Sequence, residues 1–165
     1  PPQWVAPQGS PVLDNQGGVL GDDDVSEALA LPFSFAFPGG STSVIHATAN
    51  GEVYLGATSQ LTADVTPNGF ELAAHQPRIA ALWCDLEPLA NLATSPTSGV
   101  YFAVAASGTE AYVTWSDVAD GRGGSPLSGS TSVSVQCVLR SDGSFALRTS
   151  RGSRRCGATL SRSPT

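Results

Sequence analysis

Runs in which large apolar side chains alternate with smaller ones recur along this chain, and most end in residues typical of a turn. The clearest run, residues 31–37, places Phe33, Phe35 and Phe37 on one face of an extended strand. Pro38, Gly39 and Gly40 then end it as a turn. Because a period of two residues is the period of a β-strand, this pattern favours an all-β fold.

The rest of the chain repeats this organisation. Asn50-Gly51 is a strong hairpin signal between two apolar runs. About eight strands are predicted, at residues 31–37, 44–48, 52–55, 79–86, 100–105, 111–116, 133–139 and 145–147. The best helical segment, residues 71–75, is one turn at most, and Gly (18) plus Pro (12) make 30 of 165 residues. We therefore expect an antiparallel β-sandwich of about eight strands with long Gly/Pro/Ser-rich loops.

The length of 165 residues fits one domain with flanking segments. We expect an extended N-terminal segment at residues 1–18, the sandwich at 19–150 and an Arg/Ser-rich tail at 151–165. The chain begins at Pro1, from which we expect a processed or excised piece. No run of 18 apolar residues is present, so we expect no membrane insertion.

Charge is distributed unevenly along the chain. Residues 1–120 carry 13 acidic groups and one Arg, whereas residues 121–165 carry one Asp and seven Arg, giving −12 and +6 and the net −6. The acidic body argues against nucleic acid as a partner. The basic end is predicted to bind an acidic surface, including the body of another copy, through Arg151, Arg154, Arg155 and Arg162. The alternative is a solvated tail.

Several segments together resemble a known family. They are the strand at 31–40, the hairpin at 49–56, the run Arg78-Ile-Ala-Ala-Leu-Trp-Cys-Asp-Leu86, the segment 99–102, the segment 111–118 and the segment 138–145. Their order and spacing over residues 19–150 resemble the nidogen-like (NIDO) extracellular β-sandwich domain. This resemblance implies an extracellular or cell-surface module of matrix proteins or adhesins, and it carries over no catalytic site.

Four acidic side chains, Asp22, Asp23, Asp24 and Glu27, lie within seven residues. Calcium takes six to eight hard oxygen ligands, so this cluster is a candidate calcium site, although its spacing is not that of an EF-hand. Two alternatives remain open: a turn into the first strand made by Asp24 or Ser26, and an acidic patch for an Arg-rich partner. Calcium is therefore the one cofactor considered, and no other is expected.

The three cysteines are Cys84, Cys137 and Cys156. A Cys137–Cys156 disulfide would fold the tail back on the sandwich, and this pairing is preferred. Cys137 lies on the apolar face of its strand, so a buried free thiol is the alternative.

Catalytic motifs are missing from the sequence. The two histidines have no zinc spacing, and no Gly-x-Ser-x-Gly elbow occurs. Trp83 and Trp115 are expected in the core, and Asp85 and Asp117, two residues after each Trp, are expected to bind nearby backbone N–H groups. We therefore expect no enzyme.

Two functions remain. The first is a structural or adhesion module that self-assembles in a matrix, wall or surface appendage, with the acidic body of one copy accepting the basic tail of the next. The second is a secreted carbohydrate-binding module, with Trp4 as the best residue to stack on a glycan and Tyr54, Tyr101 and Tyr112 as weaker candidates.

Overall fold

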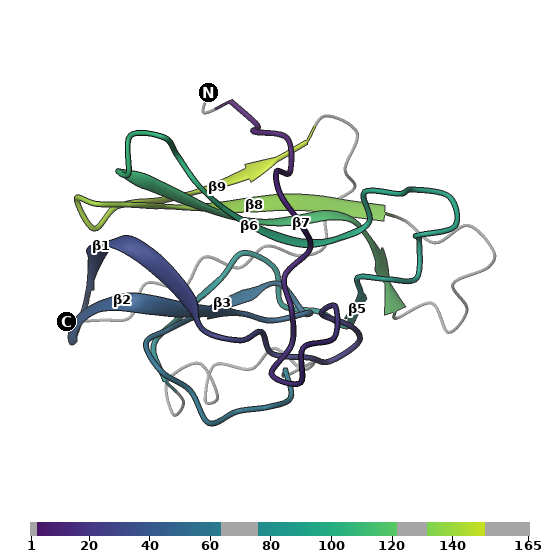
Figure 1. Ribbon diagram of the computed structural model, residues 1–165, viewed down its shortest axis with the longest axis horizontal. Helices are drawn as coiled ribbons and strands as arrows, with labels where there is room; N and C mark the ends of the chain where they lie inside the picture. Colours follow the sequence, from purple (N-terminus) through teal and green to yellow (C-terminus); the bar gives the residue numbers. More distant parts are fainter. Residues whose placement is uncertain (1–2, 64–75, 122–131, 151–165) are drawn as a thin grey trace.

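The computed structural model describes residues 3–63, 76–121 and 132–150 and shows two antiparallel sheets stacked face to face (Figure 1). The first sheet has the order β1-β2-β3-β4, with strands β1 (Leu29–Phe37), β2 (Gly40–Ala47), β3 (Glu52–Leu55) and β4 (Arg78–Ala80). The second has the order β5-β7-β8-β9, with β6 also paired to β7; its strands are β5 (Leu86–Glu87), β6 (Gly99–Val104), β7 (Glu110–Asp120), β8 (Ser132–Arg140) and β9 (Phe145–Thr149). The expected β-sandwich is confirmed. No helix capable of crossing a membrane is found among these residues.

One expected strand is wrong. Residues 79–86 do not form one continuous strand but contribute β4 to the first sheet and β5 to the second. Between them the chain crosses from one sheet to the other, and Leu82 N donates to Gly51 O at 3.0 Å. The crossing carries buried Ala81, Leu82 and Cys84, so its apolar run reflects burial between layers and not ladder pairing. The predicted helical turn at residues 71–75 lies outside the described residues.

The core lies between the two sheets, as the alternation in the sequence predicts. Ile45 and Val53 of the first sheet and Trp115 and Val135 of the second are all buried in one apolar cluster. Phe35 is also buried there, and Phe33 and Phe37 pack against its margin. The period-two pattern of β1 therefore directs its aromatic residues inward, with exposed residues between them.

The turn between β2 and β3 is buried where the sheets meet. The indole Nε1 of Trp115, on the second sheet, donates to the carbonyl of Thr48 at 2.8 Å. Asn50 Oδ1 accepts a hydrogen bond from Leu86 N at 2.9 Å, which also fixes the start of β5. Gly51 has φ +93°, and a Cβ there would overlap Leu82, so only glycine fits this position.

The outer face of the first sheet carries a buried ion pair. Arg78 Nη1 lies 2.7 Å from Glu52 Oε1, and the two side chains are 1% and 0% exposed. The guanidinium also lies over two rings, 5.6 Å from the centroid of Tyr54 and 4.9 Å from that of Trp83. Trp115 is in the core as expected, but Trp83 lies outside the core cluster, is only half-buried and packs on Arg78.

Of the two cysteines in the expected disulfide, only Cys137 lies among the described residues. Cys137 is a free thiol, completely buried on the inner face of β8, and burial raises its pKa to about 12. It faces the core between Val113 and Leu147 in the ladders. Cys156 lies outside the described residues. The alternative of a buried free thiol at Cys137 is the one observed.

We predict that Gly51→Ala lowers the free energy of unfolding by about 3 kcal/mol, because a side chain there adds backbone strain and overlap with Leu82. Gly39→Ala is the matched control, since Gly39 has φ +96° but open space around it. In this control, backbone strain alone is expected to lower the free energy of unfolding, by about 1–2 kcal/mol. Chemical denaturation measures both, and equal losses would contradict the packing role of Gly51.

Removing one partner of the buried ion pair should also be costly. Glu52→Gln is expected to lower the free energy of unfolding by about 3–5 kcal/mol, because the charge of Arg78 then loses its buried carboxylate. The double variant Glu52→Leu/Arg78→Met should lose less than the two single variants added together. Glu110→Gln is the control, since the Glu110–Arg140 pair is 28–29% exposed and should cost less than about 1 kcal/mol.

Candidate functional site

The loop before β1 is held in place by its own acidic residues. Asp23 adopts φ +55°, a left-handed conformation that Asp tolerates better than most residues. Its Oδ1 accepts a hydrogen bond from Asn50 Nδ2 at 2.8 Å, and its carbonyl accepts one from Ala63 N at 2.6 Å. Asp24 Oδ2 accepts the Gly21 N–H at 2.8 Å and closes the turn. These bonds fix the backbone from which Asp22 and Asp23 project.

Asp85 reaches the same place from the crossing segment that precedes β5. Its carbonyl accepts a hydrogen bond from Gly121 N at 2.8 Å. A Cβ at Gly121 would lie only 3.0 Å from the Asp85 carboxyl carbon. Glycine at that position therefore leaves room for the carboxylate of Asp85.

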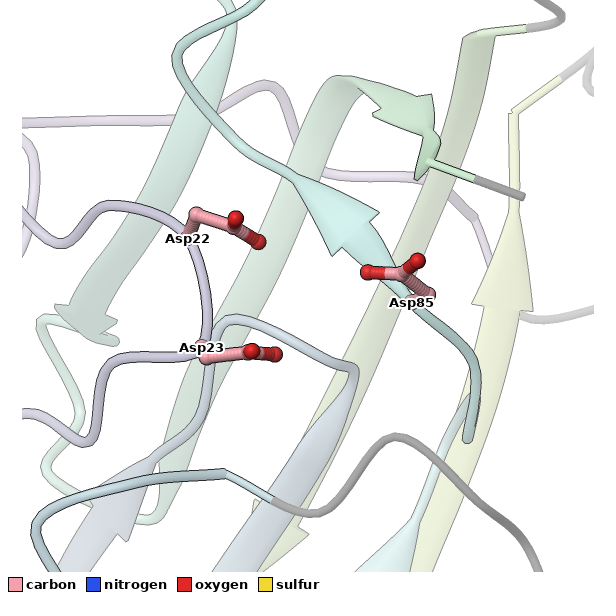
Figure 2. A group of neighbouring side chains, drawn as sticks. All are labelled: Asp22, Asp23 and Asp85. Atoms are coloured by element: carbon pink, nitrogen blue, oxygen red, sulfur yellow. The ribbon is translucent and has the colours of Figure 1, made fainter. Parts of the chain in front are cut away.

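Asp22, Asp23 and Asp85 form a compact acidic cluster at one end of the sandwich (Figure 2). One carboxylate oxygen from each lies within 4.8 Å of the others. Asp22 and Asp23 point from one loop toward Asp85, which lies across from them beside β5 (Figure 2). Such a group of carboxylates can accept charge-assisted hydrogen bonds from a guanidinium or supply oxygen ligands to a hard cation.

The cluster is electrostatically unfavourable by itself. Partial burial raises the pKa of Asp22, and the nearby charges of Asp23, Asp85, Glu87 and Asp24 raise it further. Neither of the ion pairs recorded among the described residues involves Asp22, Asp23 or Asp85. A positive group that came to this end of the sandwich would relieve the repulsion.

The observed cluster differs from the acidic set expected from the sequence. Asp22 and Asp23 are in it, but Asp24 turns its carboxylate to Gly21, and Glu27 is exposed and outside the group. Asp24 thus makes the turn that was one of the alternatives. The sequence alone does not bring Asp85 to this set, because 61 positions separate it from Asp24. Its only sequence signal was its position two residues after Trp83.

Asp117, which lies two residues after Trp115 as Asp85 does after Trp83, binds groups close to it. Asp117 lies at a bulge of β7 with φ +48°. Its carboxylate accepts hydrogen bonds from the hydroxyls of Ser95 at 2.9 Å and Ser134 at 3.2 Å, and its own N–H donates to Ser134 Oγ at 2.9 Å. These contacts tie the loop before β6 to the second sheet, which gives Asp117 a structural role.

The aromatic candidates for glycan stacking are mostly covered. Tyr54 is 1% and Tyr101 is 7% exposed, so neither presents a ring face to a ligand. Tyr112 is half-buried, lies under Arg148 and donates to Glu110 Oε2 at 2.6 Å. Trp4 is half-buried on the N-terminal segment. Trp4 therefore remains the best of the four candidates.

The basic side chains predicted to bind a partner, Arg151, Arg154, Arg155 and Arg162, lie outside the described residues. Two other Arg residues of the basic end are described, and both have partners within the chain. Arg140 Nε donates to Glu110 Oε1 at 2.8 Å, and Arg148 packs over Tyr112. The Tyr112 hydroxyl and Arg140 together hold the pKa of Glu110 below its usual value.

Comparison with models of known protein families identifies a family for this chain. The family model described as "NIDO related" matches residues 6–144, which is most of the chain. No curated protein and no solved structure matches significantly.

The raised pKa of Asp22 gives a pH-dependent prediction. The folded chain binds the proton of the Asp22 carboxyl more tightly than the unfolded chain does. The ionised carboxylate therefore lowers the free energy of unfolding at pH 7. This loss disappears as the pH falls below the pKa values of the folded and the unfolded state. Asp22→Asn should therefore raise the free energy of unfolding at pH 7 by about 0.5 kcal/mol or less, since solvent screens this exposed group. Glu27→Gln, outside the cluster, should show no such gain. An equal gain for Asp22→Asn below pH 3 would contradict this explanation.

Proposed function

The chain belongs to the NIDO-related family, and from this premise we propose that it is a non-enzymatic extracellular module that self-associates in a matrix, wall or surface appendage. The family match over residues 6–144 supports an extracellular location. We assign no catalytic step, and no cofactor is needed for this role. The side chains of the described residues best suited to chemistry have structural partners: His46 Nδ1 lies 2.8 Å from Ser26 O, and Asp117 is bound by serine hydroxyls.

The observation that carries this proposal is the acidic cluster of Asp22, Asp23 and Asp85. Its charges repel one another, and within the described residues it forms no ion pair. The chain as a whole places 13 acidic groups in residues 1–120 and seven of its eight Arg in residues 121–165. A copy of this protein therefore offers both an unneutralised acidic end and an excess of guanidinium groups.

We propose that the cluster accepts Arg side chains from the tail of a second copy. A guanidinium fits a carboxylate with two parallel hydrogen bonds, and two or three nearby carboxylates increase its attraction. Arg140 and Arg148 are engaged with Glu110 and Tyr112, so we assign the contact to Arg151, Arg154, Arg155 and Arg162. Because the two surfaces differ, the contact is head-to-tail and leads to a ring or a filament.

We expect the chain to form assemblies in light scattering at low ionic strength and to lose them as salt is raised. Exposed charges are screened beyond about 8 Å at physiological ionic strength, so the contact should weaken steeply. Asp22→Asn/Asp85→Asn should reduce assembly, and replacing the four tail Arg by Gln should abolish it. Glu27→Gln is the matched control, because it removes one exposed negative charge outside the cluster. Assembly that persists unchanged in the tail variant would rule out this contact.

Calcium distinguishes the two uses of the same carboxylates. If the cluster is an Arg acceptor, adding calcium should weaken assembly or leave it unchanged. In that case calcium should change the melting temperature of the wild type and of Asp22→Asn by the same amount. If calcium instead raises the melting temperature of the wild type and not of Asp22→Asn, the cluster is a cation site. A monomer at every salt concentration would favour the carbohydrate-binding alternative, with Trp4→Ala on a glycan array as its test.

A further inference from the structure

Strand β9 forms one edge of the second sheet and is paired to β8 on one side only (Figure 1). Within the described residues, no strand pairs with its other side. All five residues of β9 are exposed or half-buried, whereas seven of the nine residues of the neighbouring β8 are buried. The far side of β9 is therefore open to a further strand.

The hydrogen bonds to β8 use alternate residues of β9. The Ser144 carbonyl accepts a backbone hydrogen bond from the end of β8 at 3.0 Å, Ser150 N donates to β8 at 3.4 Å, and the ladder between them has no register shift. Because backbone groups alternate between the two sides of an antiparallel strand, Phe145, Leu147 and Thr149 direct their N–H and C=O groups away from β8. No hydrogen bond to these outward groups is recorded in the described part of the chain.

The other sheet edges carry features that discourage pairing with another strand. β1 contains Pro32 and a bulge, and β4 and β5 are only three and two residues long. The free edge of β6 is partly occupied by the N-terminal segment, where Val12 N donates to Val100 O at 2.8 Å. Soluble proteins prevent edge-to-edge association by such features. β9 is five residues long and has neither a proline nor a bulge, so it lacks this protection.

The side chains of β9 suit an added strand. Leu147 packs against the core, and Phe145 is 43% exposed at the end of the same face. Arg148 is the one charged residue of β9, and it lies on the outer face over Tyr112. A strand that paired with this edge would therefore cover an exposed aromatic ring without burying an unpaired charge.

We propose that β9 pairs with β9 of a second copy, antiparallel about a two-fold axis at Leu147. Leu147 then faces its own equivalent and Phe145 faces Thr149, so the outward groups form about six backbone hydrogen bonds. Arg148 lies opposite Ala146. Moving the axis one residue toward Arg148 would set two Arg148 side chains opposite each other, and moving it toward Ala146 would leave Thr149 without a partner in β9. The edge is therefore complementary to itself in one register, as a two-fold contact between identical copies requires.

This contact differs from the proposed Arg-mediated association. It uses neutral hydrogen bonds and leaves the acidic cluster free, so it should persist at salt concentrations that screen charges. The paired segment is short, and we expect a weak dimer in solution. Copies already held together by the Arg contact would form it at a higher effective concentration.

Thr149→Pro tests the contact on the full 165-residue chain. Thr149 is exposed and its N–H points away from β8, so proline removes a donor to the second copy but no bond of the β8–β9 ladder. Each dimer loses two of its about six hydrogen bonds, and the dissociation constant should rise roughly thirty-fold. Thr149→Val keeps the N–H and is the matched control, which should dimerise like the wild type. Light scattering over a concentration series near 1 M salt, where the Debye length is ~3 Å, suppresses the Arg contact.

Hydrogen exchange and a spin label locate the contact. The amides of Phe145, Leu147 and Thr149 should exchange rapidly in dilute protein and more slowly as the protein concentration rises. A nitroxide on Ser144→Cys, in a Cys156→Ser background, should give a Cα–Cα separation of about 20 Å between copies. The two labelled positions would lie about six residues apart along antiparallel strands that rise ~3.4 Å per residue.

A chain that stays monomeric up to about 1 mM near 1 M salt overturns the proposal, because even a weak contact would be populated there. A dimer that Thr149→Pro leaves unchanged, with the fold intact by its amide spectrum, also overturns it. Protection of the three amides that is already complete at high dilution would place a segment of the same chain on this edge and would overturn it too. A dimer that survives replacement of the four tail Arg shows that the two contacts are separate.

Discussion

The buried turn of residues 48–51 is the constraint on which the rest of this structure depends. It receives the Trp115 indole from the second sheet, the Leu82 amide from the crossing segment and the Leu86 amide at the start of β5. Polar backbone groups at the junction of two sheets would be costly without partners, and here those groups are satisfied by residues distant in sequence. The same turn holds Asp23 through Asn50, so the hydrogen bonds that join the sheets also position the acidic cluster.

Most of the fold could be predicted from the sequence because most of it is governed by local signals. The alternating Phe residues of β1 and the Asn50-Gly51 hairpin each act over a few residues, and both are found where the pattern placed them. The split between β4 and β5 could not be predicted in this way. Its apolar residues are buried because the segment passes between layers, and periodicity does not distinguish such a crossing from a doubly buried strand.

The candidate site was predicted only in part, because local sequence signals indicate Asp22 and Asp23 but not Asp85. Asp22 and Asp23 stand out as part of a local acidic run, whereas Asp85 joins them only through the crossing segment and its contact with Gly121. Asp24 and Glu27 share the run but not the site, since carboxylate direction depends on the turn that Asp24 itself closes. Strand alternation places Cys137 in the core as a free thiol, and its expected partner Cys156 lies outside the described residues.

The sandwich leaves only certain of its surfaces for binding. The inner faces are filled by apolar side chains, and the outer face of the first sheet is closed over Tyr54 by Val25 and Ala63. On the outer face of the second sheet, the amide of Gln136 pairs with the peptide unit of Val5, which places the N-terminal segment on that face. Among the surfaces of the described structure, the acidic cluster stands out because its carboxylates form no ion pair there. Any attraction of a positive group to this cluster is electrostatic, so it would weaken as the salt concentration rises.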